Sequence, residues 1–167
     1  MFLADRNNHL SYFDGTSKDF HNQAGDVIWA QPTTHKSENS TGAQFAALQI
    51  EPKPVANAKL FPKESTDPVI VDPAHYQVLV ENEWVRAIRA TVGPHEKLKM
   101  HKHPTTGAVV VLLDDQDMRQ FHADGTSHES HFKAGTVRWV PADAAHQDEN
   151  IGDKPFRLIR IELKQAQ

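Results

Sequence analysis

The amino-acid sequence contains two similar segments about 110 residues apart. The segment that begins at Asp14 reads DGTSKDFHNQAGDVIWAQ, and the one that begins at Asp124 reads DGTSHESHFKAGTVRWVP. With one gap the match continues far enough to pair His35 with His146. Similarity at this density indicates a duplicated module. The first copy lacks its opening half, so the chain must fold one complete module and half of another.

Matched positions in the two copies indicate residues that serve the fold. Trp29 and Trp139 recur at equivalent positions, and we expect both to be core residues. His21 matches His131, yet the first copy has only His35 at the position of the later motif and no H-x-H pair. We therefore expect the first copy to bind no metal ion, and His21 and His35 to be structural.

The complete copy reads as short apolar runs separated by turn signals such as Gly93-Pro94 and Asp124-Gly125. The expected strands are Tyr76–Val80, Trp84–Val92, Leu98–His103, Ala108–Asp114, Met118–His122, Glu129–Phe132, Val137–Val140, His146–Asn150 and Phe156–Leu163. No long amphipathic helical pattern accompanies them. The sequence therefore predicts an all-β fold, either a sandwich or a barrel.

The chain divides into three parts. Residues 1–51 are the partial module, 52–74 are a proline-rich linker, and 75–167 are the complete domain. Proline cannot donate a backbone hydrogen bond to a β-ladder, so we expect the linker to be extended and not to form a strand.

Half a module cannot close a barrel, and its unpaired strand edges invite pairing. Its strands could extend the sheets of the complete barrel or exchange with a second subunit. Alternatively, Met1 is a late start within a longer gene. We favour the first two together and expect a homodimer.

Composition excludes several classes of protein. The formal charge of −4 comes from mixed signs along the chain, so no basic stripe is available for nucleic acid. The absence of cysteine excludes disulfides and thiolate sites. No apolar run is long enough to span a membrane, and the N-terminus does not read as a signal peptide. We expect a soluble cytoplasmic protein, or a periplasmic one if the true start lies upstream.

Two of the eleven histidines form an H-x-H pair in the segment MHKHP. Because strand side chains alternate between faces, His101 and His103 point to the same face and can share a metal ion. A third histidine, His146, follows after a glycine turn, a strand and a second turn. In contrast, we expect a solvated hairpin for the histidines of the segment FHADGTSHESHF, which are His122, His128 and His131.

In these positions the sequence resembles the cupins. The first cupin motif, a glycine followed by a spacer and H-x-H, matches Gly93, His101 and His103. The second motif matches Gly135, Pro141, His146 and Asn150, with Asp143 in place of its second glycine. The resemblance covers nearly all of residues 75–164. The segments NEWVRAIRATVGP and NIGDKPFRLIRIELK also resemble small bacterial single-domain cupins, some of which are linked by name to β-alanine degradation. We treat Asn150 as structural.

The resemblance implies a double-stranded β-helix, the cupin jelly-roll barrel, with extra N-terminal strands from the half-module. Such a barrel holds one small ligand. It also implies a divalent metal ion, namely iron, nickel, zinc or manganese, bound by His101, His103 and His146.

The usual fourth ligand, a motif glutamate, falls where this sequence has Gly107 and Ala108. Asp148 or Glu149 could supply a carboxylate instead, but adjacent strand residues face opposite ways, so only one of them can. Three neutral imidazoles leave the full charge on the ion, which favours anionic, chelating substrates.

Alternation along the expected strand Leu98–His103 also gives two further predictions. Lys99 shares the parity of the histidines, so its ammonium could meet a carboxylate substrate at the barrel mouth. Leu98 and Met100 should face the other way and pack into the sandwich or against the N-terminal half-module.

Two functions agree with these features. The first is a metal-dependent enzyme, an oxygenase or a lyase, acting on a small carboxylate-containing metabolite. The second is a non-catalytic cupin that binds or senses a small molecule without a stable metal ion. The sequence assigns no catalytic residue, and a shared fold does not choose between these functions.

Overall fold

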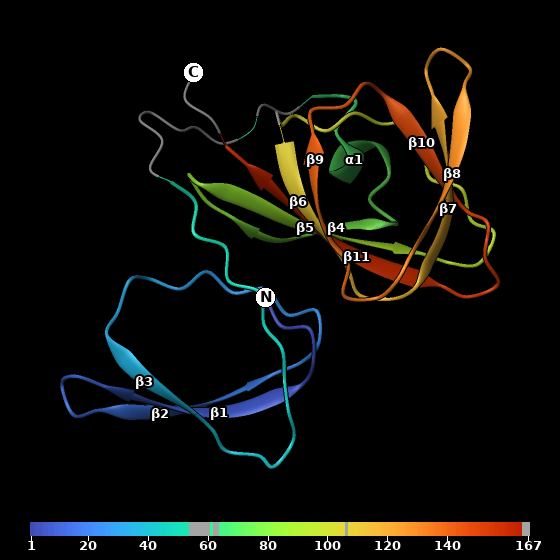
Figure 1. Cartoon of the computed structure of the whole chain (residues 1–167). Coiled ribbons are helices and arrows are strands. Elements are labelled where there is room, and N and C mark those ends of the chain that lie inside the picture. The colour runs from blue at the N-terminus through green and yellow to red at the C-terminus, as the bar shows by residue number, and fades with distance from the viewer. Residues whose placement is uncertain (54–60, 62–63, 106, 165–167) are drawn as a thin grey trace. The chain divides into compact units, whose positions relative to one another are not determined.

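The computed structural model describes residues 1–53, 61, 64–105 and 107–164. They fall into two compact units, Met1–Glu51 and Pro52–Gln167 (Figure 1). Each unit is described by itself. Part of the predicted linker, residues 54–60 and 62–63, lies outside the described residues.

The first unit contains one antiparallel sheet with the strand order β2-β1-β3. Its strands are β1 (Arg6–Tyr12), β2 (Ser17–Asn22) and β3 (His35–Asn39). Within the described part of this unit, β1 pairs with both β2 and β3.

The second unit contains two antiparallel sheets. The five-stranded sheet has the order β4-β5-β11-β6-β9, and the three-stranded sheet has the order β10-β7-β8. The strands are β4 (Tyr76–Glu81), β5 (Val85–Val92), β6 (Gly107–Leu112), β7 (Gln116–His122), β8 (Ser127–Phe132), β9 (Val137–Pro141), β10 (His146–Asn150) and β11 (Phe156–Leu163). Both sheets contribute side chains to one internal cavity, so they face each other as in the predicted double-stranded β-helix (Figure 1).

The sheet of the first unit has the same order and register as the three-stranded sheet of the second. Arg6 pairs with Asn22, as Gln116 pairs with Phe132, and both pairs are related by a shift of 110 positions. The hairpin turns also agree, because Gly15 and Gly125 both have positive φ angles, of 84° and 87°. Glycine adopts this backbone conformation without steric cost.

Eight of the nine expected strands form within about two residues of their predicted ends. The exception is Leu98–His103, which is not a continuous strand. Two isolated bridges join this part of the chain to β10. One pairs Lys97, just before the segment, with Glu149, and the other pairs His101 with His146. Between these bridges the segment has one more residue than β10, as in a β-bulge.

This extra residue changes the predicted alternation of side chains. Leu98 is buried and lines the internal cavity, although its parity placed it on the outer face. Met100 is 42% exposed, whereas His101 and His103 are both buried. A bulge therefore lets residues of both parities face inward here.

The predicted linker ends earlier than residue 74, because its last part is folded. Asp67 caps the short helix α1 (Pro68–Val71) by accepting a hydrogen bond from the Val69 amide. Asp72, just after the helix, accepts one from the Lys99 amide, and Thr66 accepts one from the Lys102 amide. This folded part thus supports the segment that carries the histidines.

The described residues include no helix of the length and apolar character needed to cross a membrane, since α1 has four residues.

The prediction that Trp29 and Trp139 are core residues is wrong. Trp139 is 58% exposed and Trp29 is 38% exposed. In the second unit β9 is an edge strand. Arg138 and Val140, which precede and follow Trp139 on this strand, are among the residues that line the cavity, and Trp139 is not. The indole instead covers Gly107, where a Cβ atom would lie 2.2 Å from the ring.

One apolar core of the second unit is formed by buried residues of β4, β5, β11 and the 98–103 segment. Its members are Tyr76, Ile88, Ala90, Val92, Leu98 and Phe156. Ile88 is fully buried, whereas Thr91 on the same strand is exposed.

Ile88→Ala should lower the free energy of unfolding by about 2–5 kcal/mol, because it leaves a cavity in this core. Thr91→Ala, the control on the outer face of the same strand, should change it by less than about 0.5 kcal/mol. Urea unfolding of both variants measures the difference. Equal effects of the two substitutions would contradict the assignment of the core.

Candidate metal centre

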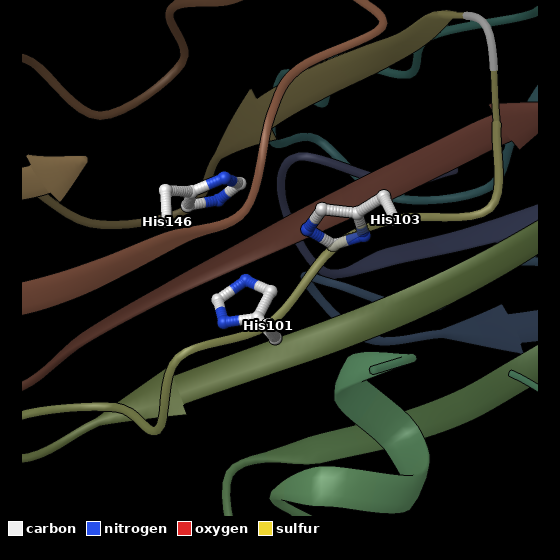
Figure 2. Close-up of side chains that lie close together, drawn as sticks. All are labelled: His101, His103 and His146. Carbon is white, nitrogen blue, oxygen red and sulfur yellow. The ribbon is translucent and has the colours of Figure 1, made fainter. Parts of the chain in front are cut away.

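Three buried imidazoles gather in the second unit (Figure 2). His101 and His146 lie opposite each other on bridged segments, joined by reciprocal backbone hydrogen bonds of 2.9 Å. His103 follows two residues after His101. One nitrogen from each of the three rings lies within 4.8 Å of the other two, and the ring centroids are 4.5–5.7 Å apart. The structure therefore brings together the three residues predicted as metal ligands.

Each ring is oriented by an acceptor at its Nδ1 atom. Nδ1 of His101 lies 2.8 Å from the Lys99 carbonyl, and Nδ1 of His146 lies 3.0 Å from the Ala144 carbonyl. Nδ1 of His103 lies 2.7 Å from Glu162 Oε1.

A carbonyl oxygen can only accept a hydrogen bond, so the Nδ1 atoms of His101 and His146 carry the protons. The Glu162 carboxylate assigns the same tautomer to His103. All three Nε2 atoms are then left with lone pairs. This is the arrangement in which histidine ligands are held at metal sites.

The environment also favours the neutral form of the rings. Burial, followed by the proximity of His146, lowers the pKa of His101. Burial and then the charge of Arg160 lower the pKa of His103 well below its usual value. Metal ions bind neutral imidazole, so no proton has to be displaced from these two rings near neutral pH.

Behind His103 lies a buried network of charges. Oε2 of Glu162 accepts a hydrogen bond of 2.7 Å from Arg86 Nε, while Oε1 accepts the one from His103. The other side of the Arg86 guanidinium donates to both oxygens of Asp67, at 2.6 and 3.3 Å. Arg160 Nε lies 3.4 Å from Glu162 Oε1. Two guanidinium groups and two carboxylates thus balance in charge inside the barrel.

The cavity between the two sheets has a volume of about 150 Å³. Its wall is partly apolar, with Leu98, Val110, Leu112, Phe156 and Leu158, and His103 and His146 also line it. The histidine cluster therefore borders a space that can hold a small ligand.

Asp148 faces this cavity and Glu149 does not, which confirms that only one of the two carboxylates points inward. Asp148 Oδ1 accepts a hydrogen bond from Gln120, and Oδ2 lies 3.8 Å from His146 Nε2. Glu149 instead forms an ion pair with Arg119. Of these two residues, Asp148 is thus the one that could supply a further ligand.

The strand pairing gives a physical account of the missing motif glutamate. Ala108 is fully buried and lies directly opposite Glu162, so the two side chains share one face. A side chain on Gly107 would meet the indole of Trp139. The space that a glutamate at 108 would use is shared with Glu162, which already orients His103.

Lys99 is not brought into the site. Its ammonium donates a hydrogen bond of 3.0 Å to the Val71 carbonyl at the end of α1, and Lys99 is not among the residues that line the cavity. The bulge removes the regular alternation on which its predicted position depended.

The remaining histidines differ in their surroundings. His131 is exposed and pairs with Asp117, while His21 contacts Asn7 at the matching position of the first unit. His122 Nε2 lies 3.1 Å from His128 Nδ1. His128 and His131 are both exposed, as expected for a solvated hairpin, although His128 also borders the cavity and His122 is half-buried.

Asn150 has the structural role that we predicted. It is buried, and its amide nitrogen donates to the carbonyls of Gly93 and Lys154. Asn150 therefore fixes the turn that follows β10.

Sequence reasoning missed four buried polar residues of the site, namely Tyr76, Arg86, Arg160 and Glu162. Tyr76 OH lies 3.1 Å from His101 Nε2, and burial followed by the charge of Asp148 raises the pKa of Tyr76 well above its usual value. A usable signal was present in the segment IRIEL, where charged residues alternate with apolar ones on a strand that the pattern places inside the domain.

No family model matches the chain, and no curated protein matches it. Solved structures do. A cupin domain from Bordetella pertussis is 25% identical over 53% of this chain and 91% of that chain, with a TM-score of 0.49.

An RmlC-like cupin family protein with a double-stranded β-helix fold from Methanocaldococcus jannaschii is 12% identical over 72% of this chain and 94% of that chain, with a TM-score of 0.44. An RmlC-like cupin from Desulfovibrio desulfuricans is 16% identical over 68% and 97%, with a TM-score of 0.39. The fold of the second unit is assigned from its own strand pairing.

Glu162→Gln should lower the free energy of unfolding by about 3–5 kcal/mol, because it leaves buried guanidinium charge without its counter-charge. Glu129→Gln breaks the exposed pair with Arg119 and should cost less than about 1 kcal/mol. Urea unfolding at neutral pH compares the two. A loss for Glu162→Gln no larger than for Glu129→Gln would show that the buried network is not needed.

Proposed function

We propose that this chain, a cupin by the architecture of its second unit, binds one divalent metal ion through His101, His103 and His146. The ion would be iron, nickel, zinc or manganese. We further propose that the protein is a metal-dependent enzyme, an oxygenase or a lyase, that acts on a small carboxylate-containing metabolite.

The observation that carries the proposal is the shared orientation of the three rings. Each Nδ1 proton is directed to an acceptor outside the cluster, so three Nε2 lone pairs are left for a common partner. Ligands about 2.1 Å from one tetrahedral ion lie about 3.4 Å apart, so small side-chain movements from the observed spacing bring all three within reach.

A bound ion would supply Lewis acidity that polarises a carboxylate or carbonyl oxygen. The residues of the chain have separate tasks. Glu162 keeps His103 in the required tautomer, and the apolar wall around Leu112 and Phe156 limits water around the ligand. Tyr76 keeps its proton because its pKa is raised, so it can donate a hydrogen bond within the cavity that it lines.

A second function is favoured by one contact. The hydroxyl of Tyr76 lies 3.1 Å from His101 Nε2 and can donate to that lone pair. One of the three Nε2 lone pairs then has a partner without an ion, which favours a non-catalytic cupin that binds or senses a small molecule.

Metal content separates the two functions. Tag-free protein should contain about one metal ion per chain by elemental analysis, and His101→Ala or His146→Ala should remove most of it. His131→Ala, the control at an exposed histidine, should leave the content unchanged. Substoichiometric metal that His101→Ala does not lower would support the non-catalytic function instead.

We also propose that the first unit is the second half of a duplicated cupin module that binds no metal ion itself. The equal strand order and register of the two three-stranded sheets support this origin. Within the described part of the chain, β2 and β3 each have one unpaired edge, and such edges favour strand exchange between two subunits.

The assembly that follows is a homodimer. The mass of one chain is 18.8 kDa, and size-exclusion chromatography with light scattering should give twice this value. In the dimer, residues 1–51 should resist limited proteolysis because their edges are covered. A monomer whose first unit is cut rapidly would contradict strand exchange.

A further inference from the structure

Arg160 lines the cavity, and two of its buried donor atoms form no hydrogen bond with the described part of the chain. The residue is 7% exposed, and its Nε and Nη2 atoms are buried without a hydrogen-bond acceptor among the described residues. A buried donor without a partner is costly, so such an atom calls for an explanation. One explanation is a ligand that is bound during function.

A purely structural role for Arg160 does not account for these donors. Both oxygens of Glu162 already accept short hydrogen bonds, one from Arg86 and one from His103. The Nε atom of Arg160 reaches Glu162 Oε1 only at 3.4 Å. Glu162 is therefore satisfied without Arg160, while Nη2 is left free to bind another acceptor.

The position of Arg160 fits a ligand in contact with the histidine cluster. Its neighbours two residues away on β11 are Leu158, which also lines the cavity, and Glu162, which holds His103. Strand alternation puts these three side chains on the inner face. An anion bound to Arg160 would thus lie in the same cavity that His103 and His146 border.

A second unsatisfied group lies in the same cavity. Ser130, on β8 of the opposite sheet, lines it, and the Ser130 hydroxyl is buried with no hydrogen-bond partner in the described part of the chain. A guanidinium on one sheet and a free hydroxyl on the other match a ligand with a carboxylate and a second polar group.

We propose that Arg160 binds the carboxylate of a small anionic ligand in this cavity, and that Ser130 contacts its second polar group. The proposal deepens the proposed function, on which it rests, by assigning the carboxylate to Arg160 in place of Lys99. A planar guanidinium suits this task, since it can donate two parallel hydrogen bonds to a carboxylate.

The size of the cavity limits the ligand. A cavity of about 150 Å³ holds a molecule of about six non-hydrogen atoms, such as benzene. A 2-oxo acid or a 2-hydroxy acid of three carbons meets this limit and has both polar groups. Pyruvate is therefore a suitable probe, and pyruvamide is its neutral counterpart of the same size.

The test measures binding of these two probes to the full chain by calorimetry, with zinc added and again after zinc removal. Arg160→Gln should weaken pyruvate binding about tenfold or more, because a charge-assisted hydrogen bond is lost. Ser130→Ala should weaken it about three- to tenfold. The affinity of the unaltered protein for pyruvamide should be no higher than the affinity of Arg160→Gln for pyruvate.

The matched control is Arg157→Gln. Arg157 lies on the same strand but is exposed and pairs with Asp114, so its substitution should leave pyruvate affinity unchanged. Zinc content should be the same in Arg160→Gln as in the unaltered protein, which separates loss of anion binding from loss of the metal site.

A second readout needs no substitution. Pyruvate should shift the side-chain Nε–H resonance of Arg160 in the nuclear magnetic resonance spectrum, and pyruvamide should not. This readout also applies to the zinc-free protein, so it decides on Arg160 even if zinc does not bind and the proposed function fails. Equal pyruvate affinity in folded Arg160→Gln, or no pyruvate binding and no resonance shift with or without zinc, would overturn the proposal.

Discussion

The hydrogen bonds of the Glu162 carboxylate connect the fold of the second unit to its histidine cluster. One oxygen accepts from Arg86, which continues to Asp67 at the cap of α1, and the other accepts from His103. A fully buried charge is tolerated only when it is paired and hydrogen-bonded. The Glu162 carboxylate thus holds β11 to β5 and orients the imidazole of His103. Through Arg86 it is also connected to α1, the helix that supports the 98–103 segment.

Most of the fold follows from the sequence because strand patterns and turn signals are local. The expected strand His146–Asn150 forms with the predicted ends, and the pairing of β1 with β2 mirrors that of β7 with β8. The segment Leu98–His103 was predicted less well. Its bulge arises from pairing with β10, a partner distant in sequence, so local alternation could not reveal it. For the same reason the exposure of Trp139 depended on β9 lying at a sheet edge.

The candidate site shows the same division between local and distant information. The three histidines could be found because H-x-H on a strand and a motif around His146 are visible in the sequence. Their orienting partners could not, since Glu162 lies 59 residues from His103 and meets it only through the strand order of the barrel. Lys99 was predicted from side-chain alternation, which fails at the bulge. Arg160 was not predicted, although the charged residues among the apolar ones of the segment IRIEL were a local signal for it.

The pairing of Ala108 with Glu162 limits which substitutions this part of the barrel can accept. A glutamate at 108 would place a second carboxylate directly beside the first, and like charges at opposed positions of a sheet repel. Making residue 162 neutral would remove that repulsion, but it would deprive Arg86 and His103 of the acceptor that they share. A carboxylate at one of these two positions therefore excludes a carboxylate at the other.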